Sequence, residues 1–394
     1  MSPRKMHDIA IVGAGMVGAA LAMKLAHEGF DVAVIEPCAP ATWSRQDDVD
    51  LRVVAVAPSS ARLFADLDIW PDLLSARACA YRHMRVWDCL APGELNFDAS
   101  ELDESALGWI VENRAIQHLL WQRLQHDANI TLRCPARVSA TDADEQRRTL
   151  TLDDGSMLSA RLVVAADGAN SALREMLGIA THERDYAQRA LVAHVSTQQP
   201  HEFTAWQRFL PGAVLAFLPL ADGRSSIVWS LPDGEADRML ALDDAQFCKA
   251  LGAAFDFRLG TVTGTTPRAA FPLRLRTADR YLAPRFALIG DAAHVVHPLA
   301  GQGVNLGLRD VQELAETLIA ARDDKRNFAA ESTLRKFERR RRSDNTLSAH
   351  AFDAIQRVFA SQATPLAAVR GIGLAAVSRI GPLKRLFAAH AAGR

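Results

Sequence analysis

Residues 9–36 read IAIVGAGMVGAALAMKLAHEGFDVAVIE, and this stretch decides the fold. The apolar run at 9–12 predicts a buried strand, and the pattern after the glycines predicts a helix that continues to about Glu28. A second strand is expected over 31–35, and Glu36 follows it directly. Strand, helix and strand in this order predict a βαβ unit with a parallel sheet.

Three glycines in this unit follow the spacing GxGxxG. Gly13 permits the tight turn, Gly15 lets backbone approach a pyrophosphate, and Gly18 lets the helix pack closely on the strand. The phosphates would lie on the free N–H groups of the helix N-terminus. Glu36 can accept hydrogen bonds from the adenosine ribose, and its charge disfavours NADP. The unit predicts a dinucleotide site and leaves open whether the ligand is NAD or FAD.

Composition and charge narrow the class of protein. A chain of 394 residues exceeds what one hydrophobic core usually organises, so two domains are expected. Lys and Arg number 45 against 46 Asp and Glu, so no net positive field recruits nucleic acid. The five cysteines are scattered without a CxxC pair, which argues against a disulfide framework or a zinc site and is typical of the reducing cytoplasm.

The N-terminus is similar to a secretory signal, because the basic MSPRK precedes an apolar run. A signal would end at a small-residue cleavage site, whereas here the pattern continues into the second strand. We therefore predict a buried strand and helix. No other apolar run in the sequence is long enough to span a bilayer.

Two later strands also lead into an acid. Residues 162–166 predict a buried strand that ends at Asp167 and Gly168, and 286–289 predict another that leads to Asp291. The ends of parallel strands gather at one edge of an open sheet, where ligands bind. NAD uses mainly the first βαβ unit. FAD needs further contacts for its ribityl chain and ring, so these two strand ends favour FAD.

Three motifs in combination resemble the single-component flavin-dependent aromatic hydroxylases: GAGMVG with Glu36, ADGANSALR at 166–174, and GDAAHVVHPLAGQGVNLG at 290–307. Other stretches are similar to the branch of that family that acts in ubiquinone biosynthesis, namely 51–70, 108–124 and 204–220. Within the branch, three stretches are most similar to the 2-polyprenylphenol hydroxylases that act at ring carbon 5: 72–88, 152–171 and 225–231.

The resemblance implies an FAD-dependent monooxygenase that hydroxylates the aromatic ring of a polyprenylated phenol through a C4a-hydroperoxide of the flavin. Dioxygen would be the co-substrate and NAD(P)H the reductant. The sequence has no second GxGxxG unit, so the reductant would dock transiently, and a protein electron donor is an alternative. Hydroxylation at another ring position of the same pathway, or a flavin reductase or dehydrogenase of the same fold, are the alternative activities.

The resemblance also implies which residues hold the flavin. Arg52 and Arg114 match arginines near the pyrophosphate and ribityl chain, although lone arginines are more often surface or ion-pair residues. Asp291 would accept hydrogen bonds from ribityl hydroxyls. The N-terminus of a helix predicted over 304–322 would stabilise the negative charge of the reduced ring. The full expected set is Gly13, Gly15, Gly18, Glu36, Arg52, Arg114, Asp167, Gly168, Asp291, Gly301, Gly303, Val304 and Asn305.

The histidines at 294 and 297 invite a metal interpretation, but no third ligand is evident, so we predict no metal site. For His294 we expect a hydrogen-bonded residue packed under the flavin. His297 is a candidate for acid–base chemistry, because histidine titrates near neutrality. Pro298 would wall the ring near its reactive edge.

Residues 185–275 alternate short β-rich runs with turns and predict a second, mostly antiparallel sheet with one helix at 243–255. Its aromatic residues are candidates for a pocket that excludes water around a prenylated ring. For any one of them, a place in the core of the sheet is the alternative. The pocket candidates are Trp206, Phe217, Trp229 and Phe271.

We therefore expect an α/β protein with a discontinuous FAD-binding domain, a substrate-binding domain and a C-terminal helical region. The FAD domain comprises 1–80, 108–182 and 278–345, the substrate domain 81–107 and 183–277, and the helical region 346–394. After Asp353 the chain carries basic residues and no acid. This basic, amphipathic tail suits an anionic membrane surface or a partner protein of the pathway, with a docked helix as the alternative. The expected location is the cytoplasm or the inner face of its membrane.

Overall fold

The computed structural model describes residues 6–90, 93–296 and 303–360. One mixed sheet has the strand order β18-β19-β11-β1-β2-β8, and a β9–β10 hairpin is added to β11. The pairs between β19, β11, β1, β2 and β8 are parallel. Its strands are β1 Met6–Val12, β2 Val32–Ile35, β8 Ile130–Arg133, β9 Val138–Ala143, β10 Arg148–Leu152, β11 Met157–Ala165, β18 Leu282–Ala283 and β19 Phe286–Leu288.

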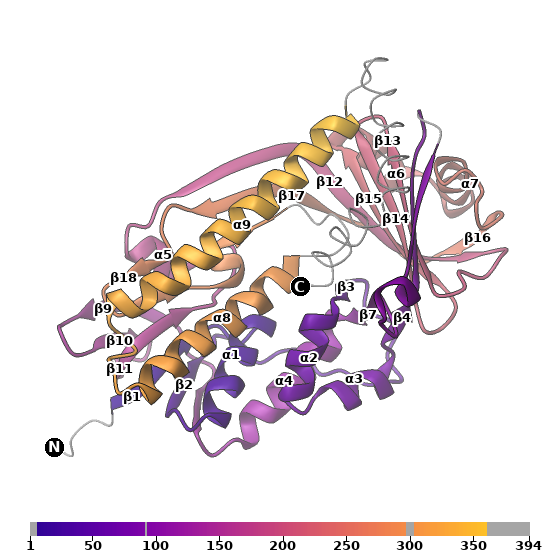
Figure 1. The fold of residues 1–394 in the computed structure, drawn as a ribbon. Helices are drawn as coiled ribbons and strands as arrows, with labels where there is room; N and C mark the ends of the chain where they lie inside the picture. Colours follow the sequence, from indigo (N-terminus) through magenta and orange to yellow (C-terminus); the bar gives the residue numbers. More distant parts are fainter. Residues whose placement is uncertain (1–5, 91–92, 297–302, 361–394) are drawn as a thin grey trace.

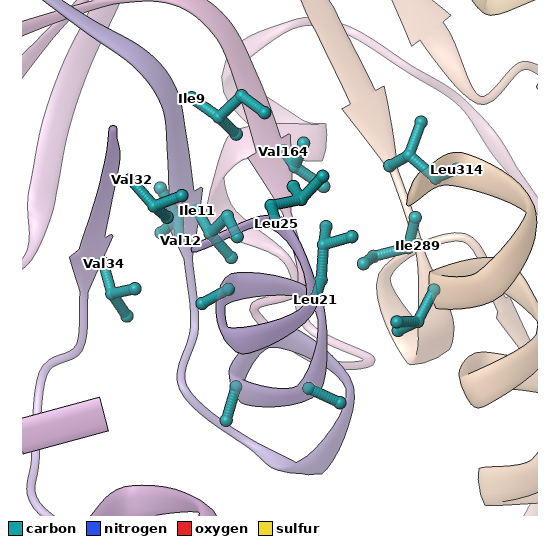
Figure 2. Packing of buried hydrophobic residues seen from close by; sticks show 14 of the residues in the cluster. Ile9, Ile11, Val12, Leu21, Leu25, Val32, Val34, Val164, Ile289 and Leu314 are labelled. Atoms are coloured by element: carbon teal, nitrogen blue, oxygen red, sulfur yellow. The ribbon is translucent and has the colours of Figure 1, made fainter. Parts of the chain in front are cut away.

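The first βαβ unit lies at the centre of this sheet. Helix α1 (Met16–His27) connects β1 to β2 and presents small and aliphatic side chains to the strands (Figure 2). Ile11 is paired with Val164 of β11 and with Val34 of β2, so β1 has a parallel neighbour on each side. Because helices cover the centre of the sheet, β2 and β19 are buried at every position and show no polar alternation.

A second sheet has the order β20-β17-β12-β15-β14-β13-β5-β6, with β16 beside β12. Its neighbouring strands are antiparallel except for β13 with β5. The long strands β12 and β17 extend from beside the first sheet across the second (Figure 1). The strands are β5 His83–Asp88, β6 Glu94–Asp98, β12 Thr181–Thr197, β13 Thr204–Leu210, β14 Ala213–Pro219, β15 Ser225–Pro232, β16 Val262–Thr265, β17 Ala269–Ala278 and β20 His294–Val295.

The two faces of this second sheet have different neighbours. One face packs under α6 (Asp233–Ala241) and α7 (Asp244–Ala254) in a hydrophobic cluster. The other face packs against a small third sheet of order β3-β7-β4. The strands of this third sheet are β3 Val53–Val56, β4 Cys79–Tyr81 and β7 Gly108–Glu112. The second face therefore lies toward the dinucleotide-binding part of the chain.

Helices complete the first domain. Helix α8 packs on α1, and the long helix α9 packs on α8 and crosses toward the second sheet (Figure 1). The remaining helices are α2 Pro58–Asp66, α3 Trp70–Ala76, α4 Asn113–His126, α5 Ala172–Met176, α8 Gly303–Asp323 and α9 Glu331–Ala360, with short 3-10 turns η1 Ala99–Leu102 and η2 Gly290–Ala292. The expected fold class is confirmed. The domain boundaries stay a prediction, with β12 and β17 shared between the two sheet regions.

Candidate functional site

The glycines of the first turn have distinct steric surroundings. A Cβ on Gly13 would lie 2.3 Å from the carbonyl oxygen of Ala166, and the backbone there has φ of +100°. A Cβ on Gly18 would lie 2.0 Å from the carbonyl oxygen of Gly13. Among the described residues, a Cβ on Gly15 would meet nothing within 4 Å. Gly13 and Gly18 are therefore required by packing, whereas Gly15 borders open space at the start of α1.

Helix α1 begins without a side-chain cap and without an acid in its own first turn. Gly15 is the N-cap and offers no side chain. Its first N–H groups lack helical partners and favour an anion. Glu36, at the end of β2, accepts the N–H of Ala14 at 2.6 Å and that of Cys38 at 3.2 Å. The predicted ribose acceptor thus also fixes the phosphate turn.

Asp167 and Gly168 follow β11 beside this turn. One carboxylate oxygen of Asp167 accepts the N–H of Leu173 at 3.3 Å, and the other is buried without a partner among the described residues. Burial raises the pKa of Asp167 above its ordinary value. Arg174 donates to the carbonyl oxygens of Ala169 and Ala292, at 2.8 and 2.9 Å. It therefore joins the turn after β11 to the turn after β19.

Asp291 lies in that turn after β19. It is solvent-exposed, yet the surrounding protein raises the pKa of its carboxyl group against the opposing charges of His294 and Arg52. Both properties suit a carboxylate on the wall of a recess. Arg52 lies with its guanidinium carbon 5.7 Å from the ring centre of Phe271 in β17. Arg52 and Phe271 are thus brought together from distant parts of the chain, and the charge of Arg52 acts on Asp291.

Helix α8 begins beside the phosphate turn. Val17 in the first turn of α1 fills the space that a Cβ would need at Gly290 and at Gly307, 3.2 and 2.7 Å away. No acidic residue occupies the first turn of α8, and a Cβ on Gly303 would meet no atom of the described residues within 4 Å. The N-terminus of α8 is therefore close to that of α1, as a cofactor spanning both requires.

The side chain of Asn305 has a structural task. Its Oδ1 accepts the N–H of Ala57 at 2.9 Å and the hydroxyl of Ser60 at 2.8 Å, and its Nδ2 donates to the carbonyl oxygen of Ala55 at 2.7 Å. These bonds tie α8 to β3 and α2. The predicted contact of Asn305 with a flavin would therefore be made by its backbone. The same holds for its neighbour Val304.

His294 belongs to a buried network that the sequence did not reveal. Its Nε2 is 2.6 Å from Asp310 Oδ2, which also accepts the N–H of Gly290 at 2.9 Å. Arg341 of α9 donates to Asp310 Oδ1 at 2.8 Å. Burial alone would raise the pKa of Asp310, but His294 and Arg341 outweigh it and hold that pKa below its ordinary value. The expected burial and hydrogen bonding of His294 are confirmed.

Arg114 stands in the first turn of α4 and donates to the carbonyl oxygen of Thr42 at 2.7 Å. Its Nε is buried without a partner among the described residues. Three other predicted site residues, His297, Pro298 and Gly301, lie outside the described residues. Among the described residues, no group of His, Cys, Asp or Glu side chains is arranged to hold a metal ion.

The four pocket candidates separate onto opposite faces of the second sheet. Trp229 is paired with Leu191 and Leu215, and it lies with Trp206 and Phe217 in the cluster under α6 and α7. The ring of Phe217 stacks on Phe255 with centroids 3.8 Å apart. These three side chains pack in the core of the sheet, so we do not keep them as pocket residues.

Phe271 lies on the other face. It is paired with Ala190, which is paired with Ser230, the neighbour of Trp229 along β15. Paired residues share a face of the sheet, and neighbouring residues along a strand point to opposite faces. Phe271 therefore lies on the face of Ser230, opposite to Trp229. Phe271 is 41% exposed and remains a pocket candidate beside Arg52.

These features fit FAD. Two helix N-termini without acidic residues suit the pyrophosphate and the reduced ring, and the unpartnered oxygen of Asp167 and Nε of Arg114 are a hydrogen-bond acceptor and a donor left for a polar ligand. The open space at Gly15 matches the approach of a phosphate.

Comparisons with known proteins show the family and the fold of the chain. The sequence profile described as FAD binding domain matches residues 6–346. The chain is 39% identical to 3-demethoxyubiquinol 3-hydroxylase of Escherichia coli K12, over 98% of each chain. It is also 39% identical to the ubiquinone hydroxylase UbiL of Rhodospirillum rubrum, over 100% of this chain and 91% of that relative. The crystal structure of p-nitrophenol 4-monooxygenase PnpA from Pseudomonas putida has the same fold, with a TM-score of 0.76, 18% identity and 98% of each chain covered.

Proposed function

The chain belongs to the FAD binding domain family and is an FAD-dependent monooxygenase, and from this premise we propose that it hydroxylates the aromatic ring of a polyprenylated phenol in ubiquinone biosynthesis, at ring carbon 5. The observation that carries the proposal is the position of Arg52, which contacts the ring of Phe271, acts on the charge of Asp291 and so joins the cofactor side to the second sheet. Carbon 5 is favoured by the similarity of the stretches 72–88 and 225–231 to hydroxylases of that position.

Bound FAD supplies the redox chemistry that activates dioxygen. The chain would supply binding and orientation: the N-terminus of α1 would hold the pyrophosphate, and that of α8 would stabilise negative charge on the ring. An apolar cluster between the second sheet and β3 and β7, which includes Ala216, Leu218 and Ile110, borders this region. Exclusion of water by such a surface protects a reactive oxygen species.

A second candidate is hydroxylation of a demethoxyubiquinol at its 3 position. The name of the Escherichia coli relative, at 39% identity over nearly the full chain, favours it. The two candidates differ in the substituents of the ring and not in the chemistry of the flavin.

The experiment that separates them is complementation of strains each blocked at one ring-hydroxylation step. Restored quinone synthesis in the strain blocked at carbon 5, and in no other, supports the first proposal. Rescue of the strain that accumulates demethoxyubiquinol would replace it with the second candidate, and rescue of neither strain would overturn both.

We further propose that the basic tail attaches the enzyme to an anionic membrane surface that holds its lipid substrate. The support is compositional, since the tail lies outside the described residues from 361 onward. Among the described residues, no helix is long and apolar enough to cross a membrane. Flotation with anionic liposomes tests the proposal: deletion of 364–394 should abolish co-flotation, and unchanged binding would refute it.

A further inference from the structure

Asp50 links the two arginines predicted to contact the cofactor. Its Oδ1 accepts the backbone N–H of Arg52 and its Oδ2 accepts the backbone N–H of Arg114, both at 3.3 Å. Arg52 directly precedes β3, whereas Arg114 lies in the first turn of α4. One carboxylate therefore bridges the backbones of two residues that are far apart in the sequence, beside the hydrogen bond that the N–H of Asn113 donates to the carbonyl oxygen of Arg52 at 3.0 Å.

The same carboxylate caps helix α4. The N-cap residue, Glu112, makes no side-chain cap bond, and the first turn of α4 contains no acid. The N–H of Arg114 is one of the groups that a helix leaves without an internal partner. Asp50 supplies the missing acceptor, and its charge is favourable at the positive end of the helix.

Asp50 is itself held from two sides. Its N–H donates to Glu112 Oε2 at 2.7 Å, and Glu112 is buried and paired with Arg77, whose Nε lies 2.8 Å from Oε1. Its carbonyl oxygen lies 3.0 Å from Nε2 of His194 in β12. Burial lowers the pKa of His194, so the ring is neutral, and Nε2 carries the proton because a carbonyl oxygen only accepts.

We propose that Asp50 is a positioning residue for FAD, which it holds by fixing Arg52 and Arg114 relative to one another and to the second sheet. Both arginines have reason to face the ligand. Arg52 acts on the charge of Asp291, and Arg114 has a buried Nε without a partner among the described residues. The inference rests on FAD binding alone and is independent of the ring position that is hydroxylated.

The test measures the dissociation constant of FAD for the apoprotein by quenching of flavin fluorescence. We expect Asp50→Ala to raise it about tenfold, the range of a lost cap. Asp144→Ala is the matched control, because Asp144 also accepts two backbone N–H groups, those of Gln146 and Arg147, in the turn between β9 and β10. The control should stay within about twofold of the unchanged protein.

The decisive arm repeats Asp50→Ala in a protein that already carries Arg52→Ala and Arg114→Ala. If Asp50 acts through the arginines, its substitution there changes the dissociation constant by less than about twofold. A tenfold loss in that background, or no loss in the unchanged background, overturns the proposal. A purely structural role would weaken both backgrounds equally.

Asp50→Asn serves if the alanine variant does not fold, because the amide keeps one acceptor oxygen and should give an intermediate loss. An FAD affinity equal to that of the unchanged protein would then refute the role of Asp50. If the unchanged apoprotein binds no FAD at all, the proposed function is overturned instead, so the two failures are distinguishable.

Discussion

Replacing Gly15 with alanine should separate cofactor binding from folding. Gly15 has φ of −64° and ψ of −179°, which any residue adopts, and its added Cβ would meet no atom of the described residues within 4 Å. Alanine lowers the conformational entropy of the unfolded chain, which stabilises the folded protein by about 0.4–1 kcal/mol. Alanine is also a poorer N-cap than glycine, which costs about as much. The free energy of unfolding of the variant apoprotein should therefore stay within about 1 kcal/mol of that of the unchanged apoprotein.

FAD binding should respond differently to the same change. The new methyl group occupies the space through which the phosphates approach the start of α1. Overpacking of this kind costs about 1–3 kcal/mol, which corresponds to a dissociation constant about 5- to 150-fold higher.

Gly18→Ala is the comparison variant. Its Cβ would lie 2.0 Å from the carbonyl oxygen of Gly13 and 3.1 Å from Cβ of Ala166. We expect it to destabilise the apoprotein itself, by about 1–3 kcal/mol in urea unfolding. The account of the turn is wrong if Gly15→Ala binds FAD with unchanged affinity, or if it destabilises the apoprotein as much as Gly18→Ala does.

Three further results are expected. Asp310→Asn removes the fully buried carboxylate that Arg341 and His294 contact and leaves Arg341 paired with the less buried Asp344, so urea unfolding should show a loss of about 1.5–3 kcal/mol; a loss below about 0.5 kcal/mol would contradict the network. Burial lowers the pKa of His194 in the folded protein, so below the ordinary histidine pKa of about 6.5 the unfolded chain binds more protons, and stability falls as the pH drops through that value. His194→Gln should flatten this pH dependence of the free energy of unfolding between pH 8 and 5, and an unaltered slope would refute the prediction. Trp229→Ala should lower the free energy of unfolding by about 3–5 kcal/mol with little change in KM for a prenylphenol. Phe271→Ala removes an exposed ring, so it should raise KM and lower the free energy of unfolding by less than about 1 kcal/mol. The reverse pattern would restore Trp229 to the pocket.

The parts of the site that could be predicted are those encoded by local patterns. Each predicted strand end places its acid directly after a buried run, so Glu36, Asp167 and Asp291 were found without knowledge of the fold. Asp50 and Asp310 were missed because their partners are remote: Asp50 bonds to residues 62, 64 and 144 positions away, which no local period reports.

The faces of the second sheet could not be assigned for another reason. Every residue of strand β14 after Ala213 is buried, because both faces of the strand are covered. Alternation of polar and apolar residues is then absent, and the sequence does not distinguish the side under α7 from the side toward the flavin. Trp206, Phe217 and Trp229 were suggested as pocket residues for this reason.

The most direct test of the central claim is a single turnover of purified holoenzyme with a polyprenylphenol, NAD(P)H and ¹⁸O₂. A monooxygenase places one atom of dioxygen on the ring, so the product should carry one ¹⁸O atom from ¹⁸O₂ and none from H₂¹⁸O. If the reductant is consumed and the ring product carries no label from ¹⁸O₂, the enzyme is not the hydroxylase proposed here.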